Sequence, residues 1–432
     1  MVIKETRLDW KSWSLFKQHH FSLLVKFAVS ILLMGLAFRL FYSNYSIGVS
    51  PVIETPFVEK TVGDEAPAPV EVLENTDAIP QKEQCDLSIG DWVPNPSGPI
   101  YTNESCHIIH THQNCMTNGR PNLGYLYWKW KPRDCELPRF NAERFLELMR
   151  NKSWAFIGDS ISRNHVQSLL CILSKVEAAD LVYHDDSYPS DRWNFPSYNF
   201  TLSVIWSPFL LKAATFEDIN GVSSGDIQLH LDELDKKWTD QYQSFDYVVI
   251  SGGKWFLKAA IYYENNTITG CNYCPGKNLT EFGPEIAYRR ALKQAFNFIV
   301  SSNHSSIVLF RTTTPEHFEN AAWNNGGTCK RTVPFKEEEI SLKDIDTKFH
   351  NIELEEFEKA KTLGSGKRLK LKFLDTTHLS LLRPDGHPGP YRHFHPFEKD
   401  KNAKVQNDCL HWCLPGPIDS WSDLVMEMVI NG

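Results

Sequence analysis

The chain has 432 residues, of which 42% are hydrophobic, and a formal net charge of -8 at pH 7. This composition supplies enough apolar residues for one large core or for two domains. A mildly acidic chain lacks the basic surface typical of nucleic-acid-binding proteins, which argues against nucleic acid as the main partner.

Residues 21–42 form the only apolar segment of membrane length. A helix needs about 20 residues to span a bilayer, so this segment is just long enough. After Arg39 the next basic residue is Lys60, so the positive-inside rule places residues 1–20 in the cytosol and the rest in a lumen. No small-residue cleavage site follows, which indicates an uncleaved signal anchor. The alternative is a buried core helix.

Residues 43–84 are predicted to form a lumenal stem. From Ser50 onward the segment is rich in Pro, Glu, Val and Thr and has almost no aromatic residues. Such a composition cannot bury enough surface to fold, which also argues against a core helix directly before it.

The cysteines and the glycosylation sequons all follow the stem and indicate a secretory compartment. Cys271 and Cys274 have the spacing of half a zinc site, but no second such pair exists, so disulfides are favoured and no metal site is predicted. The ten cysteines are Cys85, Cys106, Cys115, Cys135, Cys171, Cys271, Cys274, Cys329, Cys409 and Cys413. The sequons are at Asn103, Asn151, Asn199, Asn265, Asn278 and Asn303.

Residues 85–150 are dense in Cys, Trp, Gly and Pro, and no helical or strand period persists. The sequence predicts a loop-rich lobe that disulfides hold together. Trp128 and Trp130 alternate with lysines, so these rings either line a sugar groove or pack inward from one face of a strand.

The second part, residues 151–432, opens on an apolar run that ends at Gly158 and Asp159 and is followed by Ser160. A helix is predicted from there through Leu173, so Ser160 lies in a tight turn between a strand and a helix. N–H groups at a helix N-terminus can stabilise an oxyanion on a carbon that the serine attacks. A surface turn with a helix cap is the alternative interpretation of Gly-Asp-Ser alone.

Further strands and helices alternate after this turn, which predicts a parallel α/β sheet with its site beyond the carboxyl ends of the strands. Gly252, Thr312 and Asp375 follow strands, as Ser160 does. The predicted strands are at 202–206, 246–251, 307–311 and 369–374, and the predicted helices are at 285–300 and 348–361.

The C-terminal part supplies a base for the serine. Asp408 and His411 are close enough in sequence for one loop to bring His411 to Ser160 while Asp408 orients its imidazole. Bonds from Cys409 and Cys413 would hold that loop. Asp385 with His387 is a rival pair, although its Pro- and Gly-rich setting is more typical of a turn.

Gly158-Asp159-Ser160 together with the Asp408–His411 motif resembles the plant trichome-birefringence-like family of polysaccharide O-acetyltransferases, which have a PC-esterase-type domain. The resemblance covers essentially all of residues 85–432. The motifs at 314–320 and 382–389 resemble the branch that acetylates xyloglucan side chains.

The resemblance implies a fold, a location and a set of site residues. The fold is an SGNH-hydrolase-like α/β/α sandwich with a parallel sheet, plus a smaller disulfide-braced lobe, on a single-pass type II Golgi membrane anchor. The implied triad is Ser160, Asp408 and His411. The implied disulfides are Cys85–Cys135, Cys106–Cys171, Cys115–Cys409 and Cys329–Cys413, with Cys271–Cys274 as a local pair.

The chain departs from the SGNH pattern where an oxyanion-hole Asn is expected after a central strand. Residues 251–255 read Ser-Gly-Gly-Lys-Trp there. The remaining candidates for the oxyanion hole are Gly158, the Ser160 N–H and Asn164.

The expected reaction is acetyl transfer through an acetyl-serine to a polysaccharide, with xyloglucan galactosyl side chains as the expected acceptor. It requires an acetyl donor such as acetyl-CoA, a second membrane protein is a candidate for supplying it, and no bound cofactor is expected. The alternatives are an acetyl esterase with the same triad and a non-catalytic polysaccharide-binding protein.

Overall fold

The computed structural model describes residues 85–185, 190–215 and 225–430. The predicted cytosolic tail (1–20), anchor (21–42) and stem (43–84) lie outside these residues. Within the part that is described, every helix is too short or too polar to cross a bilayer.

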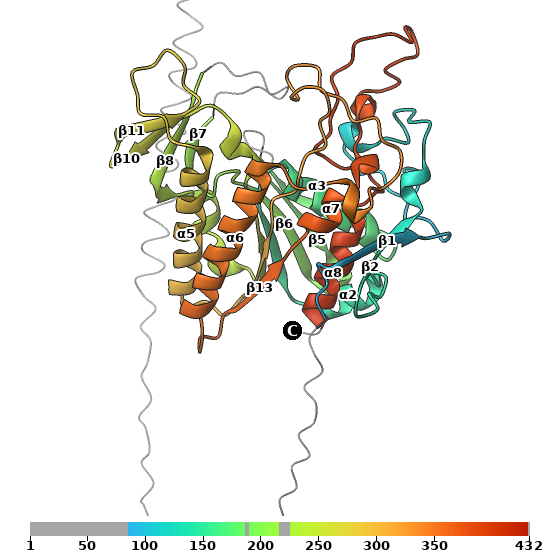
Figure 1. Ribbon diagram of the computed structural model, residues 1–432. Helices are drawn as coiled ribbons and strands as arrows, with labels where there is room; N and C mark the ends of the chain where they lie inside the picture. Colours follow the sequence, from blue (N-terminus) through green and yellow to red (C-terminus); the bar gives the residue numbers. More distant parts are fainter. Residues whose placement is uncertain (1–84, 186–189, 216–224, 431–432) are drawn as a thin grey trace, which may run out of the picture. The chain divides into compact units, whose positions relative to one another are not determined.

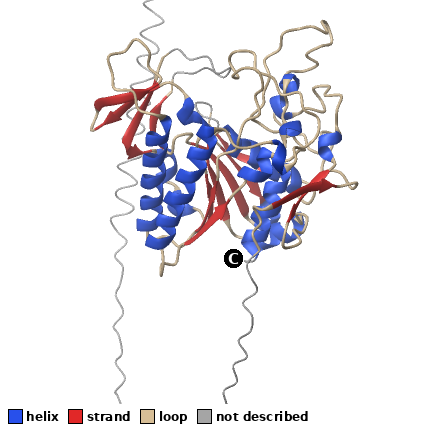
Figure 2. Ribbon diagram, in the orientation of Figure 1, coloured by secondary structure: helices blue, strands red, loops and turns tan. Residues whose placement is uncertain are grey.

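A seven-stranded sheet forms the centre of residues 85–430. Figure 1 shows its strands, and Figure 2 shows helices on both of its sides. Its strand order is β13 (Lys370–Leu374), β12 (Ile307–Arg311), β9 (Tyr247–Ile250), β3 (Ser153–Gly158), β6 (Phe200–Trp206), β5 (Asp191–Phe195) and β4 (Asp180–His184).

The sheet is mixed, which corrects the prediction of a purely parallel one. The five strands from β13 to β6 are parallel, whereas β5 is antiparallel to β6 and β4 is antiparallel to β5. Only the short turn Pro196–Tyr198 joins β5 to β6. A parallel connection needs a crossover of about a dozen residues or more, so this pair can only be antiparallel.

Alternate residues of the central strands enter two different cores. On β3, Trp154 and Phe156 belong to one core, and Ala155 and Ile157 belong to the other. Helices α2 (Ala142–Leu148), α3 (Ser160–Leu173), α7 (Thr377–Leu381) and α8 (Asp419–Ile430) cover the first face, and α4 (Lys236–Thr239), α5 (Pro284–Ser301) and α6 (Asp344–Leu363) cover the second. The result is the predicted three-layer α/β/α arrangement.

The predicted strands and helices are present with small differences at their ends. The largest difference is at α6, which begins at Asp344 instead of residue 348. The predicted helix after the serine turn ends at Leu173, as expected.

A second, four-stranded sheet was not predicted. Its order is β11 (Thr267–Asn272), β10 (Ala260–Glu264), β8 (Ile227–Leu234) and β7 (Leu211–Ala214). Asn265 and Asn266 join β10 to β11, and both have positive φ, at 49° and 58°. Two such residues between strands are typical of a tight β-hairpin, so the Asn-Asn pair was an available sequence signal.

The Cys- and Trp-rich lobe packs into the same core as the first helical layer. Its strands β1 (Gly90–Pro94) and β2 (Trp128–Pro132) pair in antiparallel fashion. Trp130 is only 3% exposed, and its ring centroid lies 5.8 Å from that of Trp92. Inward packing is therefore the correct alternative for Trp130. Tyr101 also donates a hydrogen bond to Asp419 of α8, at 2.8 Å.

Three of the five expected disulfides are present: Cys85–Cys135, Cys106–Cys171 and Cys271–Cys274. Because Cys271 and Cys274 are bonded to each other, the zinc half-site interpretation is wrong. All six sequon asparagines lie within the described residues and are at least partly exposed. Their glycosylation stays a prediction.

Candidate active site

The turn between β3 and α3 presents Ser160. Strand β3 ends at Gly158, Asp159 caps the helix by accepting the Ile161 N–H at 2.9 Å, and Ser160 is the first helical residue. A Cβ atom at position 158 would lie 2.7 Å from the Ser251 carbonyl oxygen and 2.6 Å from Ser162 Oγ. Glycine is therefore required by close packing, and the turn rests directly on the end of β9.

Ser160, His411 and Asp408 form one hydrogen-bonded chain. His411 Nε2 lies 2.7 Å from Ser160 Oγ, and His411 Nδ1 lies 2.8 Å from Asp408 Oδ2. The Asp408 side chain is 8% exposed, whereas that of His411 is 25% exposed. The serine and the histidine are thus open to a substrate, and the carboxylate is shielded behind them. Such an arrangement can activate a serine hydroxyl as a nucleophile.

The Asp408 carboxylate is kept charged despite its burial. Burial raises its pKa, but the charge and hydrogen bonds of His411, together with the nearby Arg392, outweigh this and hold the pKa of Asp408 well below its usual range. Asp408 Oδ1 also accepts the N–H groups of Leu410 and His411, at 3.1 and 3.0 Å. These bonds fix the carboxylate in the orientation that the imidazole needs.

Asn164, one of the candidates for the oxyanion hole, contacts the histidine loop. Its Oδ1 accepts the Trp412 N–H at 2.7 Å, and its Nδ2 donates to the Trp412 carbonyl at 3.3 Å. Asn164 is fully buried. Because both ends of its amide bond the Trp412 backbone, Asn164 connects α3 to the loop beside His411. The oxyanion role of the Ser160 N–H and of Gly158 stays a prediction.

Two disulfides hold the loop, but their pairing corrects the expected one. Cys115 bonds Cys413, and Cys329 bonds Cys409. The resemblance implied the exchanged pairing. Cys409 and Cys413 lie on either side of His411, and both are fully buried, so sequence spacing alone could not decide which partner each one reaches. The two bonds tie the loop to separate parts of the chain.

The rival pair of Asp385 and His387 does not face the serine. Asp385 makes a fully buried, two-pronged ion pair with Arg383, whose Nε lies 2.8 Å from Asp385 Oδ1. His387 Nδ1 lies 2.7 Å from the carbonyl oxygen of His411. These residues lie behind the His411 loop, an arrangement that no local sequence pattern marks.

A buried polar group beneath the serine turn was also not predicted. Ser251 Oγ lies 2.8 Å from Ser162 Oγ and accepts a hydrogen bond from Arg311 Nη2 at 2.7 Å. Arg311 is 2% exposed. The Ser-Gly-Gly segment after β9 thus supports the turn from below.

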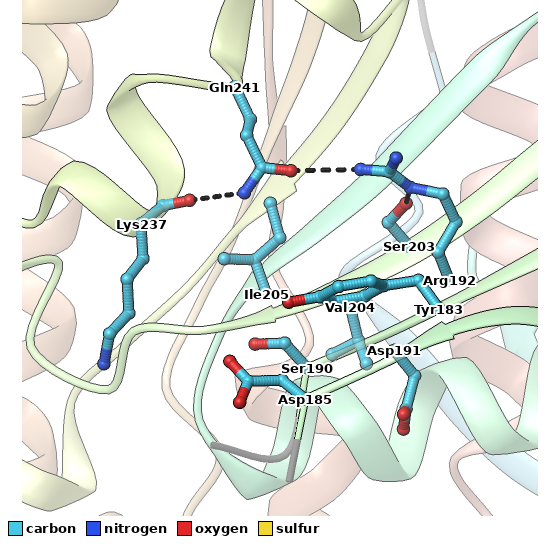
Figure 3. Close-up of a pocket in the computed structure, with 10 residues that line it drawn as sticks. All are labelled: Tyr183, Asp185, Ser190, Asp191, Arg192, Ser203, Val204, Ile205, Lys237 and Gln241. Atoms are coloured by element: carbon cyan, nitrogen blue, oxygen red, sulfur yellow. Dashed lines mark hydrogen bonds between the residues drawn. The ribbon is translucent and has the colours of Figure 1, made fainter. Parts of the chain in front are cut away.

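A polar cavity lies along β6, β5 and β4, on the side of β3 away from β9. Trp206 pairs with Gly158 across β6 and β3, and the Trp206 N–H donates to Ser190 Oγ at 2.9 Å on the cavity wall. Figure 3 shows Gln241 joining the Lys237 carbonyl to Arg192. The cavity has a volume of about 330 Å³ and is lined by Tyr183, Asp185, Ser190, Asp191, Arg192, Ser203, Val204, Ile205, Lys237 and Gln241.

A group of metal-ligating residues lies in the smaller sheet. Ligand atoms of His230, Asp232 and Glu233 all lie within 4.8 Å of one another. Lys212 already pairs with Glu233 at 2.8 Å, and Asp232 accepts the Asn265 N–H at 2.7 Å. Lys212 thus balances the charge of Glu233, and Asp232 has a backbone hydrogen-bond partner.

Comparison with known proteins identifies two matching families. Residues 137–428 match the GDSL/SGNH-like acyl-esterase family found in Pmr5 and Cas1p, and residues 83–136 match the PMR5 N-terminal domain. The chain is 54% identical to protein trichome birefringence-like 25 of Arabidopsis thaliana over 426 residues, which cover 94% of this chain and 92% of the relative.

Two further relatives carry an activity in their names. Xyloglucan O-acetyltransferase 1 of Populus trichocarpa is 42% identical over 398 residues, covering 91% of this chain and 90% of the relative. Xyloglucan O-acetyltransferase 1 of Arabidopsis thaliana is also 42% identical, over 363 residues that cover 83% of each chain.

Proposed function

Because the chain belongs to the GDSL/SGNH-like acyl-esterase family and is an enzyme that transfers or hydrolyses acyl groups, we propose that it transfers acetyl groups to a plant cell-wall polysaccharide. We further propose that the acceptor is the galactosyl side chain of xyloglucan. The observation that carries the chemistry is the Ser160–His411–Asp408 hydrogen-bond chain. The relatives named xyloglucan O-acetyltransferase support the acceptor.

The first half-reaction forms an acetyl-enzyme. His411 Nε2 takes the proton of Ser160 Oγ, and the oxygen attacks the carbonyl carbon of the acetyl donor. The tetrahedral oxyanion is stabilised by N–H groups at the start of α3, among them that of Ser160. When the intermediate collapses, the bond between the acetyl carbon and the donor breaks, His411 gives its proton to the leaving group, and the acetyl group stays bonded to Ser160 Oγ.

The second half-reaction reverses these roles. A sugar hydroxyl takes the place of the departed donor, His411 removes its proton, and the sugar oxygen attacks the acetyl carbon. His411 then returns the proton to Ser160 as the ester bond to the serine breaks. Throughout, the buried Asp408 carboxylate stabilises the transient imidazolium and holds its Nδ1–H.

The donor and the location complete the proposal. We assign the acetyl donor to a diffusible thioester such as acetyl-CoA or to a membrane protein that presents acetyl groups. We place the enzyme in the Golgi membrane as a single-pass type II protein, with residues 85–432 in the lumen. The segment at 21–42 and the five disulfides support this topology.

The proposal is tested by incubating the full chain with acetyl donor and xyloglucan oligosaccharides and following acetylated sugar by mass spectrometry. Ser160→Ala should abolish transfer. Ser174→Ala is the matched control, because Ser174 bonds the Cys171 carbonyl near the far end of the same helix. Unchanged transfer by Ser160→Ala would contradict the proposed mechanism. Release of free acetate without acetylated sugar would favour the esterase, and binding without either product would favour the non-catalytic alternative.

A further inference from the structure

Two buried histidines lie in contact behind the His411 loop. His317 and His387 are 6% and 3% exposed, and they lie on separate loops, after β12 and after α7. His317 Nδ1 is 2.7 Å from His387 Nε2. Neither ring reaches Ser160 in the hydrogen-bond chain described above, so the proposed reaction leaves both without a role.

The outer contacts of the pair are both to backbone carbonyl oxygens. His387 Nδ1 lies 2.7 Å from the His411 carbonyl, and His317 Nε2 lies 2.8 Å from the Leu381 carbonyl. A carbonyl oxygen only accepts, so the bond to His411 requires a proton on Nδ1 of His387. A neutral imidazole with Nδ1–H has a bare Nε2, which accepts the Nδ1–H of His317. In this arrangement His317 sets the tautomer of His387.

Burial supports uncharged rings. It lowers the pKa of His317 to about 4 and holds the pKa of His387 well below its ordinary value. Two neutral rings carry two N–H protons for three contacts, so one of the two outer carbonyls is left without a donor. A buried carbonyl tolerates this better than a buried N–H does. With the unpaired carbonyl at Leu381, the His411 carbonyl keeps its donor.

His387 also holds the residue after His411. Its ring stacks on Trp412 with the centroids 4.3 Å apart and the planes at 24°. The Cys413 N–H donates to the Gly386 carbonyl at 3.0 Å, next to His387 in the chain. Residues 386 and 387 therefore hold the backbone around His411, and Asp408 holds the His411 side chain.

We propose that His387 is a positioning residue for His411, and that His317 fixes the tautomer of His387 that this requires. The proposal rests on the proposed function, in which His411 is the base. In this proposal the pair holds the His411 carbonyl in place. A fixed carbonyl in turn keeps the His411 imidazole directed toward Ser160 Oγ. A displacement of about 1 Å in a catalytic group can lower a rate by about 100-fold.

Substitutions at each histidine separate the effect of its hydrogen-bond donor from the effect of its aromatic ring. His387→Phe keeps an aromatic ring against Trp412 and removes the hydrogen bond, whereas His387→Asn keeps an N–H donor near the position of Nδ1. The same pair of changes at His317 removes or retains its donor to His387. His304→Phe is the control, because it removes another imidazole–carbonyl contact, to Phe245 at 2.7 Å, on a loop before β12.

The full chain and its variants are compared by kcat and KM for the acetyl donor and by backbone hydrogen exchange of the peptide spanning residues 405–416. We expect His387→Phe to lower kcat by about 10- to 100-fold with KM unchanged and to speed exchange in that peptide. We expect His317→Phe to act in the same direction, both Asn variants to recover much of kcat, and His304→Phe to match the wild type.

The double variant His317→Phe/His387→Phe tests whether His317 affects the reaction only through His387. We expect it to be no slower than His387→Phe alone, because His317 acts only through His387. Wild-type kcat in His387→Phe, or additive losses in the double variant, would overturn the proposal. Unchanged transfer by Ser160→Ala in the same assay would instead overturn the proposed function, while the exchange data would still show whether the pair holds the loop.

Discussion

One hydrogen bond joins Ser160 of the serine turn to His411 of the histidine loop, but different forces place the turn and the loop. Ser160 lies between β3 and α3, so a continuous strand and a capped helix fix it. The His411 loop has no regular structure of its own. It is held by two disulfides, by Asn164 and by His387. The nucleophile therefore depends on local structure, whereas the base depends on contacts between segments far apart in the sequence.

The largest effect should come from breaking the contact between the two regions. Ser160→Ala and His411→Ala should each lower transfer by about a million-fold, because each removes the activated nucleophile. The double variant should be hardly slower than either single one, since the two residues act as a unit. Single-turnover assays of the three variants measure this. A double variant much slower than both singles would show that the residues act independently.

Asp408→Asn should cause the next largest loss of activity, and this substitution changes only the histidine loop. The amide cannot stabilise an imidazolium and favours the wrong imidazole tautomer, so we expect a loss of about 10,000-fold in kcat. Circular dichroism should show an unchanged fold. A rate close to that of the wild type would mean that Asp408 only supports the backbone of the loop.

Removing disulfides should show further that the histidine loop depends on contacts between distant segments. Replacing Cys329 and Cys409 by Ser should lower the free energy of unfolding by about 2–5 kcal/mol and also impair transfer, because this bond holds the His411 loop. The control replaces Cys271 and Cys274, which close a much shorter loop in the smaller sheet. Denaturant unfolding and transfer assays on both double variants test this. Equal losses of activity would contradict a special role for the loop bond.

These comparisons also show which parts of the molecule were predictable. The strand, turn and helix around Ser160 were predicted because their signals lie within about 20 consecutive residues. The Asp408–His411 motif was found for the same reason. The pairing of Cys115, Cys329, Cys409 and Cys413 was not, because exchanged pairings leave the sequence pattern unchanged.

Long-range polar contacts were not predicted. The His317–His387 pair joins two loops that are 70 residues apart in the sequence. The Arg311–Ser251 bond lies beneath the serine turn and joins the ends of two strands. No local pattern marks such contacts, because each partner alone is an ordinary buried polar residue.

The smallest predicted effect concerns the buried carboxyl group of Glu353 in α6. Glu353 is fully buried and accepts the Thr313 N–H at 2.8 Å, and burial raises its pKa from 4.5 to about 7. A raised carboxyl pKa means that the folded state holds the proton more tightly. Its contribution to stability is complete below about pH 4.5 and is lost as the pH rises through 7. Glu353→Gln should therefore flatten the fall in unfolding free energy between these pH values, as measured by denaturant unfolding. An unchanged slope would contradict the raised pKa.

The most direct test of the mechanism is to trap the acetyl-enzyme and then discharge it. The full chain is incubated with acetyl donor without acceptor, and the peptide that contains Ser160 is examined by mass spectrometry. An acetyl group should accumulate on Ser160, and xyloglucan oligosaccharides should remove it faster than buffer does. Absence of acetyl-Ser160 from a protein that still acetylates xyloglucan would contradict the mechanism, and equally fast discharge by buffer would make the protein an esterase.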